Sequence, residues 1–145
     1  MREFVNLDEN NYKDVAQIDA DCLASEKWSE EQFRAEIGDT SKFYAVCKIN
    51  GKVVGFGGYA QVLDEGNILN IAVAKDYRKQ GIATEILNIM IQNGVNNGIT
   101  AFTLEVRESN QAARLLYEKA GFKFVGIRKN FYSDKENACI YWLYT

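Results

Sequence analysis

One stretch of the chain, Asn67 to Met90, has residue types and spacing that suit the binding of a phosphate or pyrophosphate. It opens with a short apolar run to Val73, which predicts a buried strand. It closes with four apolar residues at helical spacing, namely Ile82, Ile86, Leu87 and Met90. In the intervening loop, Gly81 and Ala83 would let the backbone approach an anion, and the first N–H groups of the helix have no partners there. The pattern also fits an ordinary packing turn, because small residues open many helices.

The chain contains no His, and this absence limits the chemistry that it can perform. It excludes a Ser-His-Asp or Cys-His nucleophilic site and argues against zinc. Proton transfer must then use carboxylates, tyrosines, lysines, cysteines or water. The three cysteines, Cys22, Cys47 and Cys139, are too widely spaced for a metal cluster, so no metal is expected. We expect them to be reduced thiols that are buried as small apolar side chains.

The length and composition predict one soluble globular domain over residues 1–145. Hydrophobic residues make up 47% of the chain and charged residues 26%, and the net charge is −3. This balance argues against a general nucleic-acid-binding surface. No apolar run approaches the length of about 20 residues that a membrane span requires. Met1–Phe4 does not resemble a signal peptide, so a cytoplasmic location is expected.

Hydrophobic periodicity and turn residues divide the chain into alternating strands and helices. Strands are expected over residues 3–7, 42–49, 52–62, 67–73, 99–106, 122–127 and 138–144. Helices are expected from Asp8 through Cys22, from Ser29 to Gly38, from Gly81 through Met90 and from Asn110 to Gly121, with a loop over residues 93–98. Because hairpins and strand-helix units alternate, we predict an α/β (α+β) protein with a mixed sheet and helices on both faces.

Several local signals support this division. Asn50-Gly51 predicts a tight hairpin between two strands. Ser29 and Gln32 have the spacing of a capping box, and Trp28 and Phe33 that of a hydrophobic staple. Three glycines within residues 55–58 predict a bulge or a close approach of another backbone.

The chain resembles the GNAT family of acetyl-CoA-dependent N-acetyltransferases over nearly its whole length. Three segments carry the resemblance. Residues 71–83 contain Ile-Ala-Val followed by Arg-x-x-Gly-x-Ala, and residues 104–122 contain Leu-Glu-Val-Arg-x-x-Asn and the expected helix that ends at Gly-Phe. Residues 127–132 read Ile-Arg-x-Asn-Phe-Tyr. The resemblance implies the GNAT fold, a mixed, mostly antiparallel sheet of about seven strands flanked by four helices. Strands four and five would splay around acetyl-CoA, the cosubstrate.

The resemblance also implies roles for particular residues. The backbone of Ile71, Ala72 and Val73 would hold the pantetheine arm and polarise the acetyl carbonyl. The pyrophosphate would be cradled by the loop and helix start formed by Arg78, Lys79, Gln80, Gly81, Ile82, Ala83 and Thr84. Asn110 would contact the cofactor, Glu105 would be the general base, Tyr117 the general acid, and Tyr132 would close over the substrate. Taken singly, Glu105 also fits a solvated strand face, Tyr117 a core aromatic and Asn110 a simple helix cap.

The chain departs from the family pattern at three positions. Ala83 stands where Gly is common, which a helical backbone would tolerate. Thr84 stands where a basic residue is frequent, and Phe131 replaces the first Tyr of a pair. The last change bears on the substrate contact more than on the chemistry.

Trp28-Ser29 and Asn70 through Val73 are similar to the family members that acetylate the N-terminal alanine of a small-subunit ribosomal protein. The expected activity is therefore transfer of acetyl to a protein N-terminus by direct attack on the thioester. Acetylation of lysine side chains or of a small-molecule amine is the alternative, and a non-catalytic CoA-binding module is a third interpretation. The expected partner is a protein or peptide N-terminus, with no direct nucleic acid and no membrane, and the enzyme is expected as a monomer or weak dimer.

Overall fold

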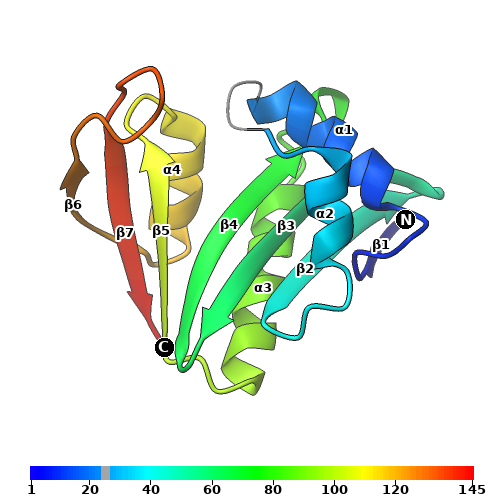
Figure 1. Cartoon of the computed structure of the whole chain (residues 1–145), viewed down its shortest axis with the longest axis horizontal. Helices are drawn as coiled ribbons and strands as arrows, with labels where there is room; N and C mark the ends of the chain where they lie inside the picture. The colour runs from blue at the N-terminus through cyan, green and yellow to red at the C-terminus, as the bar shows by residue number, and fades with distance from the viewer. Residues whose placement is uncertain (24–26) are drawn as a thin grey trace.

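One mixed sheet organises the computed structural model of this chain, which describes residues 1–23 and 27–145 (Figure 1). Its seven strands, in the order β1-β2-β3-β4-β5-β7-β6, are β1 (Arg2–Val5), β2 (Lys42–Ile49), β3 (Lys52–Val62), β4 (Glu65–Val73), β5 (Ala101–Arg107), β7 (Ala138–Tyr144) and β6 (Lys123–Arg128). All neighbouring strands are antiparallel except β4 and β5, which are parallel. The expected mixed, mostly antiparallel sheet is confirmed.

Helices cover both faces of this sheet (Figure 1). They are α1 (Tyr12–Leu23), α2 (Glu30–Glu36), α3 (Ile82–Asn96) and α4 (Gln111–Lys119), with a single 3-10 turn, η1, at Lys75–Tyr77. One apolar core joins the sheet to α3 and includes Ile86, Met90 and Phe102, which are all fully buried. A second core, with Val15, Phe33 and Phe56, joins the opposite face to α1 and α2. None of the helices within the described residues has the length and apolarity to cross a membrane.

Local signals in the sequence set several of these elements. Asn50 and Gly51 have φ values of 51° and 81°, as the tight hairpin between β2 and β3 requires. Ser29 and Gln32 form the predicted capping box, with the Ser29 oxygen accepting the Gln32 N–H at 3.1 Å. Trp28 packs on Phe33 at a ring-centroid distance of 5.3 Å, which confirms the hydrophobic staple.

The glycines of β3 allow a close approach, but at Gly57 the neighbours are side chains of α3 rather than the backbone that the sequence predicted. A Cβ at Gly57 would lie 2.7 Å from both Ile86 and Met90 of α3. The register between β3 and β4 also shifts between Gly58 and Tyr59. The extra residue at this shift is Leu69 of β4, so β3 lies opposite a bulge and against a closely packed helix.

Two predicted boundaries are wrong. Residues 93–96 belong to α3 rather than to a loop, because Gly94 lets the helix pass close over Phe102, where a Cβ would meet the ring at 2.5 Å. The first helix begins at Tyr12 rather than directly after Asp8. The Asp8 carboxylate instead accepts the N–H groups of Asn10 and Asn11, at 2.8 and 2.9 Å, and so caps the preceding turn.

Candidate active site

The separation of β4 from β5 creates the site. The two strands pair only over Glu65–Asn67 and Ala101–Thr103, and beyond this point they diverge (Figure 1). Two cavities open where they part, one of about 630 Å³ and one of about 240 Å³. Ile71, Asn110 and Ala113 line both, so the cavities meet at the divergence.

The larger cavity lies over the end of β4 and the start of α3. It is lined by Cys22, Ile71, Ala72, Val73, Tyr77, Arg78, Lys79, Gly81, Ile82, Ala83, Thr84, Asn110, Ala112, Ala113 and Leu116. Every residue predicted to bind the cofactor is among them except Gln80, whose carbonyl oxygen accepts a hydrogen bond from Arg2. Tyr77 and Leu116 were not singled out from the sequence, although Leu116 lies in one of the recognised motifs.

The start of α3 has the backbone geometry of an anion site. Lys79 and Gly81 have φ values of 63° and 82°. Gly81 is the N-cap residue of α3 and supplies no side-chain hydrogen bond to the helix. The first N–H groups of α3 therefore remain available at the cavity wall, together with the positive end of the helix dipole. Ala83 lies inside the helix, where Ala is more favourable than Gly.

Arg78 has a structural contact that its motif did not reveal. Its Nε donates to the Val73 carbonyl at 2.9 Å, and its Nη2 lies 3.3 Å from the Cys22 sulfur. The guanidinium therefore joins the end of β4 to α1 at the edge of the larger cavity. Cys22 is only partly buried, unlike Cys47 and Cys139, which are buried as expected.

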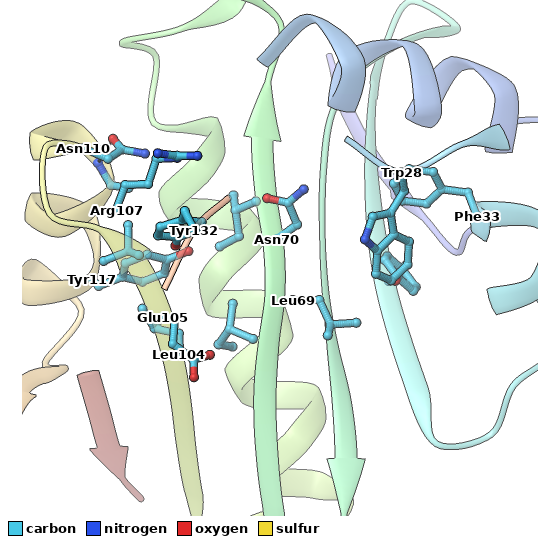
Figure 2. A pocket seen from close by; sticks show the side chains of 15 residues that line it. Trp28, Phe33, Leu69, Asn70, Leu104, Glu105, Arg107, Asn110, Tyr117 and Tyr132 are labelled. Atoms are coloured by element: carbon cyan, nitrogen blue, oxygen red, sulfur yellow. Dashed lines mark hydrogen bonds between the residues drawn. The ribbon is translucent and has the colours of Figure 1, made fainter. Parts of the chain in front are cut away.

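The smaller cavity holds the predicted catalytic side chains. Figure 2 shows Glu105, Tyr117 and Tyr132 on one side of it and Asn70 and Leu69 of β4 facing them. Its lining is Trp28, Phe33, Tyr44, Ile68, Leu69, Asn70, Ile71, Leu104, Glu105, Val106, Arg107, Asn110, Ala113, Tyr117 and Tyr132. A carboxylate, three phenols and two amides thus line one space next to the larger cavity.

Glu105 and Tyr117 differ in their surroundings. The Glu105 side chain is 28% exposed and lies 3.9 Å from the Arg128 guanidinium. Tyr117 of α4 is buried, and its hydroxyl forms no hydrogen bond with any residue among 1–23 and 27–145. Burial, and to a smaller extent Tyr132, raises the pKa of Tyr117, so this phenol keeps its proton at neutral pH.

Tyr132 is fixed by a charged cluster at the end of β5. Its ring lies 4.2 Å from the Arg107 guanidinium, which bonds to Glu136 at 2.7 Å and to Asp134 at 2.9 Å. Hydrogen bonds from Ser109 and Arg107 lower the pKa of Glu136 to about 2. The loop between β6 and β7 is therefore tied to β5 beside the cavity. Arg107 lies in a recognised motif but was not assigned a role from the sequence.

A bulge in β4 shapes the opposite wall. Gly58 pairs with Asn70 and Tyr59 pairs with Ile68, which leaves Leu69 as an extra residue in β4. The strand segment that follows has no β5 partner, since pairing with β5 ends at Asn67 in the described structure. The backbone N–H groups of this segment therefore make no strand-pairing hydrogen bonds with β5 in the described structure. A backbone N–H that stabilises an oxyanion must be unpaired in this way.

Asn110 has the structural role expected of a helix cap. Its side-chain oxygen accepts the Ala113 N–H at 3.1 Å at the start of α4. It also lines both cavities, so a cap and a ligand contact are compatible at this position. No three His, Cys, Asp or Glu side chains gather as a metal site within the described ranges.

Comparison with known proteins agrees with this geometry. The sequence pattern of the Acetyltransferase (GNAT) family matches residues 12–122. The chain is 39% identical over 116 residues to the ribosomal protein bS18 alanine N-acetyltransferase of Escherichia coli (strain K12), which covers 78% of each chain. The crystal structure of the ribosomal-protein-S18-alanine N-acetyltransferase from Escherichia coli superposes with a TM-score of 0.89 at 34% identity, over 99% of this chain and 94% of that one. Arabidopsis thaliana NAA60 in complex with acetyl-CoA shares the fold, with a TM-score of 0.90 at 18% identity over 99% and 98% of the two chains.

Proposed function

Because the chain belongs to the GNAT family of acetyltransferases, we propose that it acetylates the N-terminal α-amino group of a protein, with acetyl-CoA as the acetyl donor. The proposed acceptor is the N-terminal alanine of a small-subunit ribosomal protein, as the name of the Escherichia coli relative states for that enzyme. The observation that carries the proposal is the meeting of the two cavities where β4 leaves β5. We also propose that residues 1–145 form a single domain of this family.

The larger cavity fits the donor. The uncapped start of α3 at Gly81 would bind the pyrophosphate, with Lys79 beside it. The free side of β4 from Ile71 to Val73 would hold the pantetheine arm and place the thioester at the junction of the cavities. Acetyl-CoA supplies the activated acyl group, and the protein supplies orientation and proton transfer.

Three groups of the chain would act on the acceptor. An α-amino group has a pKa of about 8, so a modest fraction is already neutral at pH 7. The neutral amine would attack the thioester, and Glu105 would accept the proton that the nitrogen loses as the N–C bond forms, directly or through a water. A free β4 N–H would stabilise the oxyanion, and Tyr117 would protonate the departing thiolate. The raised pKa of Tyr117 supports this role, because a general acid must hold its proton until the thiolate forms.

The shape of the smaller cavity favours an N-terminus over a larger acceptor. It holds about 240 Å³ between Tyr132 on one side and Trp28 with Leu69 on the other. A narrow aromatic slot suits a terminal amine with a small side chain. A ribosomal-protein acceptor would place the enzyme in the cytoplasm, and the three free cysteines agree with a reducing compartment.

The first experiment offers acetyl-CoA and three acceptors: a peptide beginning Ala-Arg, its N-blocked form, and the same peptide with internal lysines. Thiol release gives the rate and mass spectrometry gives the site. We expect acetylation only at the free N-terminus. Acetylation of lysine, or of none of the peptides despite firm CoA binding, would refute the proposed acceptor.

A second experiment separates an enzyme from a CoA-binding module. Glu105→Gln keeps the size of the side chain but removes the base, so kcat should fall by about 10²-fold or more. The affinity for CoA, measured by calorimetry, should stay unchanged, because Glu105 lines only the smaller cavity. Unchanged turnover in this variant would remove Glu105 from the mechanism.

A further inference from the structure

Asp19 is a buried carboxylate that the mechanism above does not use. It lies on α1 and is completely inaccessible to solvent. Its Oδ2 accepts the backbone N–H of Trp28 at 2.7 Å, and its Oδ1 accepts a hydrogen bond from the Asn70 amide nitrogen. Burial holds the pKa of Asp19 above its ordinary value, and the two hydrogen bonds offset part of this effect. The carboxylate therefore joins α1, the segment before α2, and β4 beside the smaller cavity.

The bulge in β4 is what brings Asn70 to this carboxylate. Ile68 packs in the core shared with α3, so strict alternation would also turn Asn70 toward α3. The extra residue, Leu69, reverses the alternation, and Leu69 packs with the core of α1 and α2. Asn70 then faces α1, and Ile71 returns to the α3 side.

Asp19 also decides which end of the Asn70 amide faces the cavity. A carboxylate accepts hydrogen bonds and donates none, so the nitrogen of Asn70 must point toward it. The carbonyl oxygen then points toward the side of Tyr132 and Tyr117, as Figure 2 shows. An amide that donates to a carboxylate is polarised, which strengthens its oxygen as an acceptor.

We propose that the Asn70 oxygen accepts a hydrogen bond from the acceptor amine, and that Asp19 is the positioning residue that fixes this orientation. The inference rests on the proposed function, because it assumes that the amine enters the smaller cavity. A neutral primary amine has one lone pair and two N–H bonds. The lone pair attacks the thioester carbon and one proton leaves to Glu105. The second N–H remains in the product, and Asn70 supplies its acceptor during the attack.

The test reverses the amide by substitution. In Asp19→Asn, the new side chain must keep its oxygen on the Trp28 N–H, so its nitrogen faces Asn70. Asn70 then turns its oxygen toward α1 and presents its nitrogen to the cavity. We expect KM for the acceptor to rise by about tenfold, the size of one lost hydrogen bond, with a smaller change in kcat. The affinity for CoA should not change.

The exchanged pair gives the decisive readout. Asp19→Asn combined with Asn70→Asp keeps both contacts of Asp19 and returns an oxygen to the cavity, so KM should recover. Asp21→Asn is the matched control, because among the described residues this exposed side chain of α1 bonds only to Gln17, at 2.9 Å. A KM that does not recover in a folded double variant, or a normal KM in Asn70→Ala, would overturn the inference.

The variants are compared on whichever peptide the wild-type enzyme acetylates, at its N-terminus or at lysine. A lysine acceptor would therefore refute the proposed substrate and still decide the role of Asn70. A readout without substrate is the nuclear magnetic resonance signal of the Asn70 side-chain amide. Its protons should shift in Asp19→Asn and stay in place in Asp21→Asn, and an unchanged signal in Asp19→Asn would contradict the orienting role.

Discussion

Tyr117→Phe should separate catalysis from stability, because the Tyr117 hydroxyl makes no hydrogen bond with the described residues. The substitution keeps the ring and its packing on Phe122, at a centroid distance of 5.6 Å. It removes only a buried hydroxyl oxygen, and no hydrogen bond with the described residues offsets the desolvation cost of that oxygen. The free energy of unfolding should therefore stay within about 0.5 kcal/mol of wild type, or rise. Loss of a general acid should lower kcat by about 10²–10⁴-fold, which is about 3–5 kcal/mol of activation free energy.

Tyr141→Phe is the matched control. Tyr141 is also buried, but its hydroxyl donates to the Glu118 carboxylate at 2.6 Å and accepts from Arg114 at 3.1 Å. Each hydrogen bond to a charged group contributes about 1.5–3 kcal/mol. Because Glu118 is exposed and water can replace the lost hydrogen bond, the loss of stability in this variant should be below the sum of the two bonds, at about 2–4 kcal/mol. Turnover should be unchanged, because Tyr141 lines neither cavity.

The assay combines urea unfolding followed by circular dichroism with steady-state acetyl transfer to the free N-terminal peptide. The two variants should show opposite patterns. Tyr117→Phe should keep the stability of the wild type and have a low kcat, whereas Tyr141→Phe should be less stable and keep the kcat of the wild type. If Tyr117→Phe loses stability in proportion to its activity, the phenol has a structural role and the proposed general acid is wrong.

Two further predictions concern the anion site and the charged cluster. Gly81→Asp should weaken CoA binding by about tenfold or more in calorimetry, because it adds a negative charge at the start of α3. Gly38→Asp, at a similar φ of 80° with open space around it, should carry the same backbone strain without loss of affinity, and an equal loss in both would exclude an electrostatic cause. The folded pKa of Glu136 is lowered from its usual 4.5 to about 2, so its stabilising contribution is complete above about pH 4.5 and disappears as the pH falls toward 2. Glu136→Gln should flatten the melting temperature against pH over this window, and parallel curves for variant and wild type would contradict the assignment.

The parts of the fold that the sequence predicted are those with local causes. The hairpin at Asn50-Gly51 and the capping box at Ser29 depend on residues within four positions of each other. The end of α3 was missed because an Asn- and Gly-rich segment is typical of a loop. Gly94 is required there by Phe102, which is adjacent in space and distant in sequence. No local pattern reveals such a contact.

The same distinction applies to the candidate site. The residues proposed to touch substrate, such as Glu105 and Tyr117, lie in motifs that the resemblance identified, and the structure brings them to one cavity. Other residues that line the two cavities are held by contacts with distant parts of the chain. Asp19 bonds to Asn70 across 51 positions, and Cys22 contacts Arg78 across 56. A buried Asp on an amphipathic helix has no signature of its own, because its role exists only once the bulge at Leu69 has turned Asn70 toward it. The acceptor side of the site is therefore set by sheet register as much as by motif. A change that removes the bulge should turn Asn70 away from Asp19 and also reverse the faces of Ile71 to Val73, so the binding of both acceptor and donor should suffer.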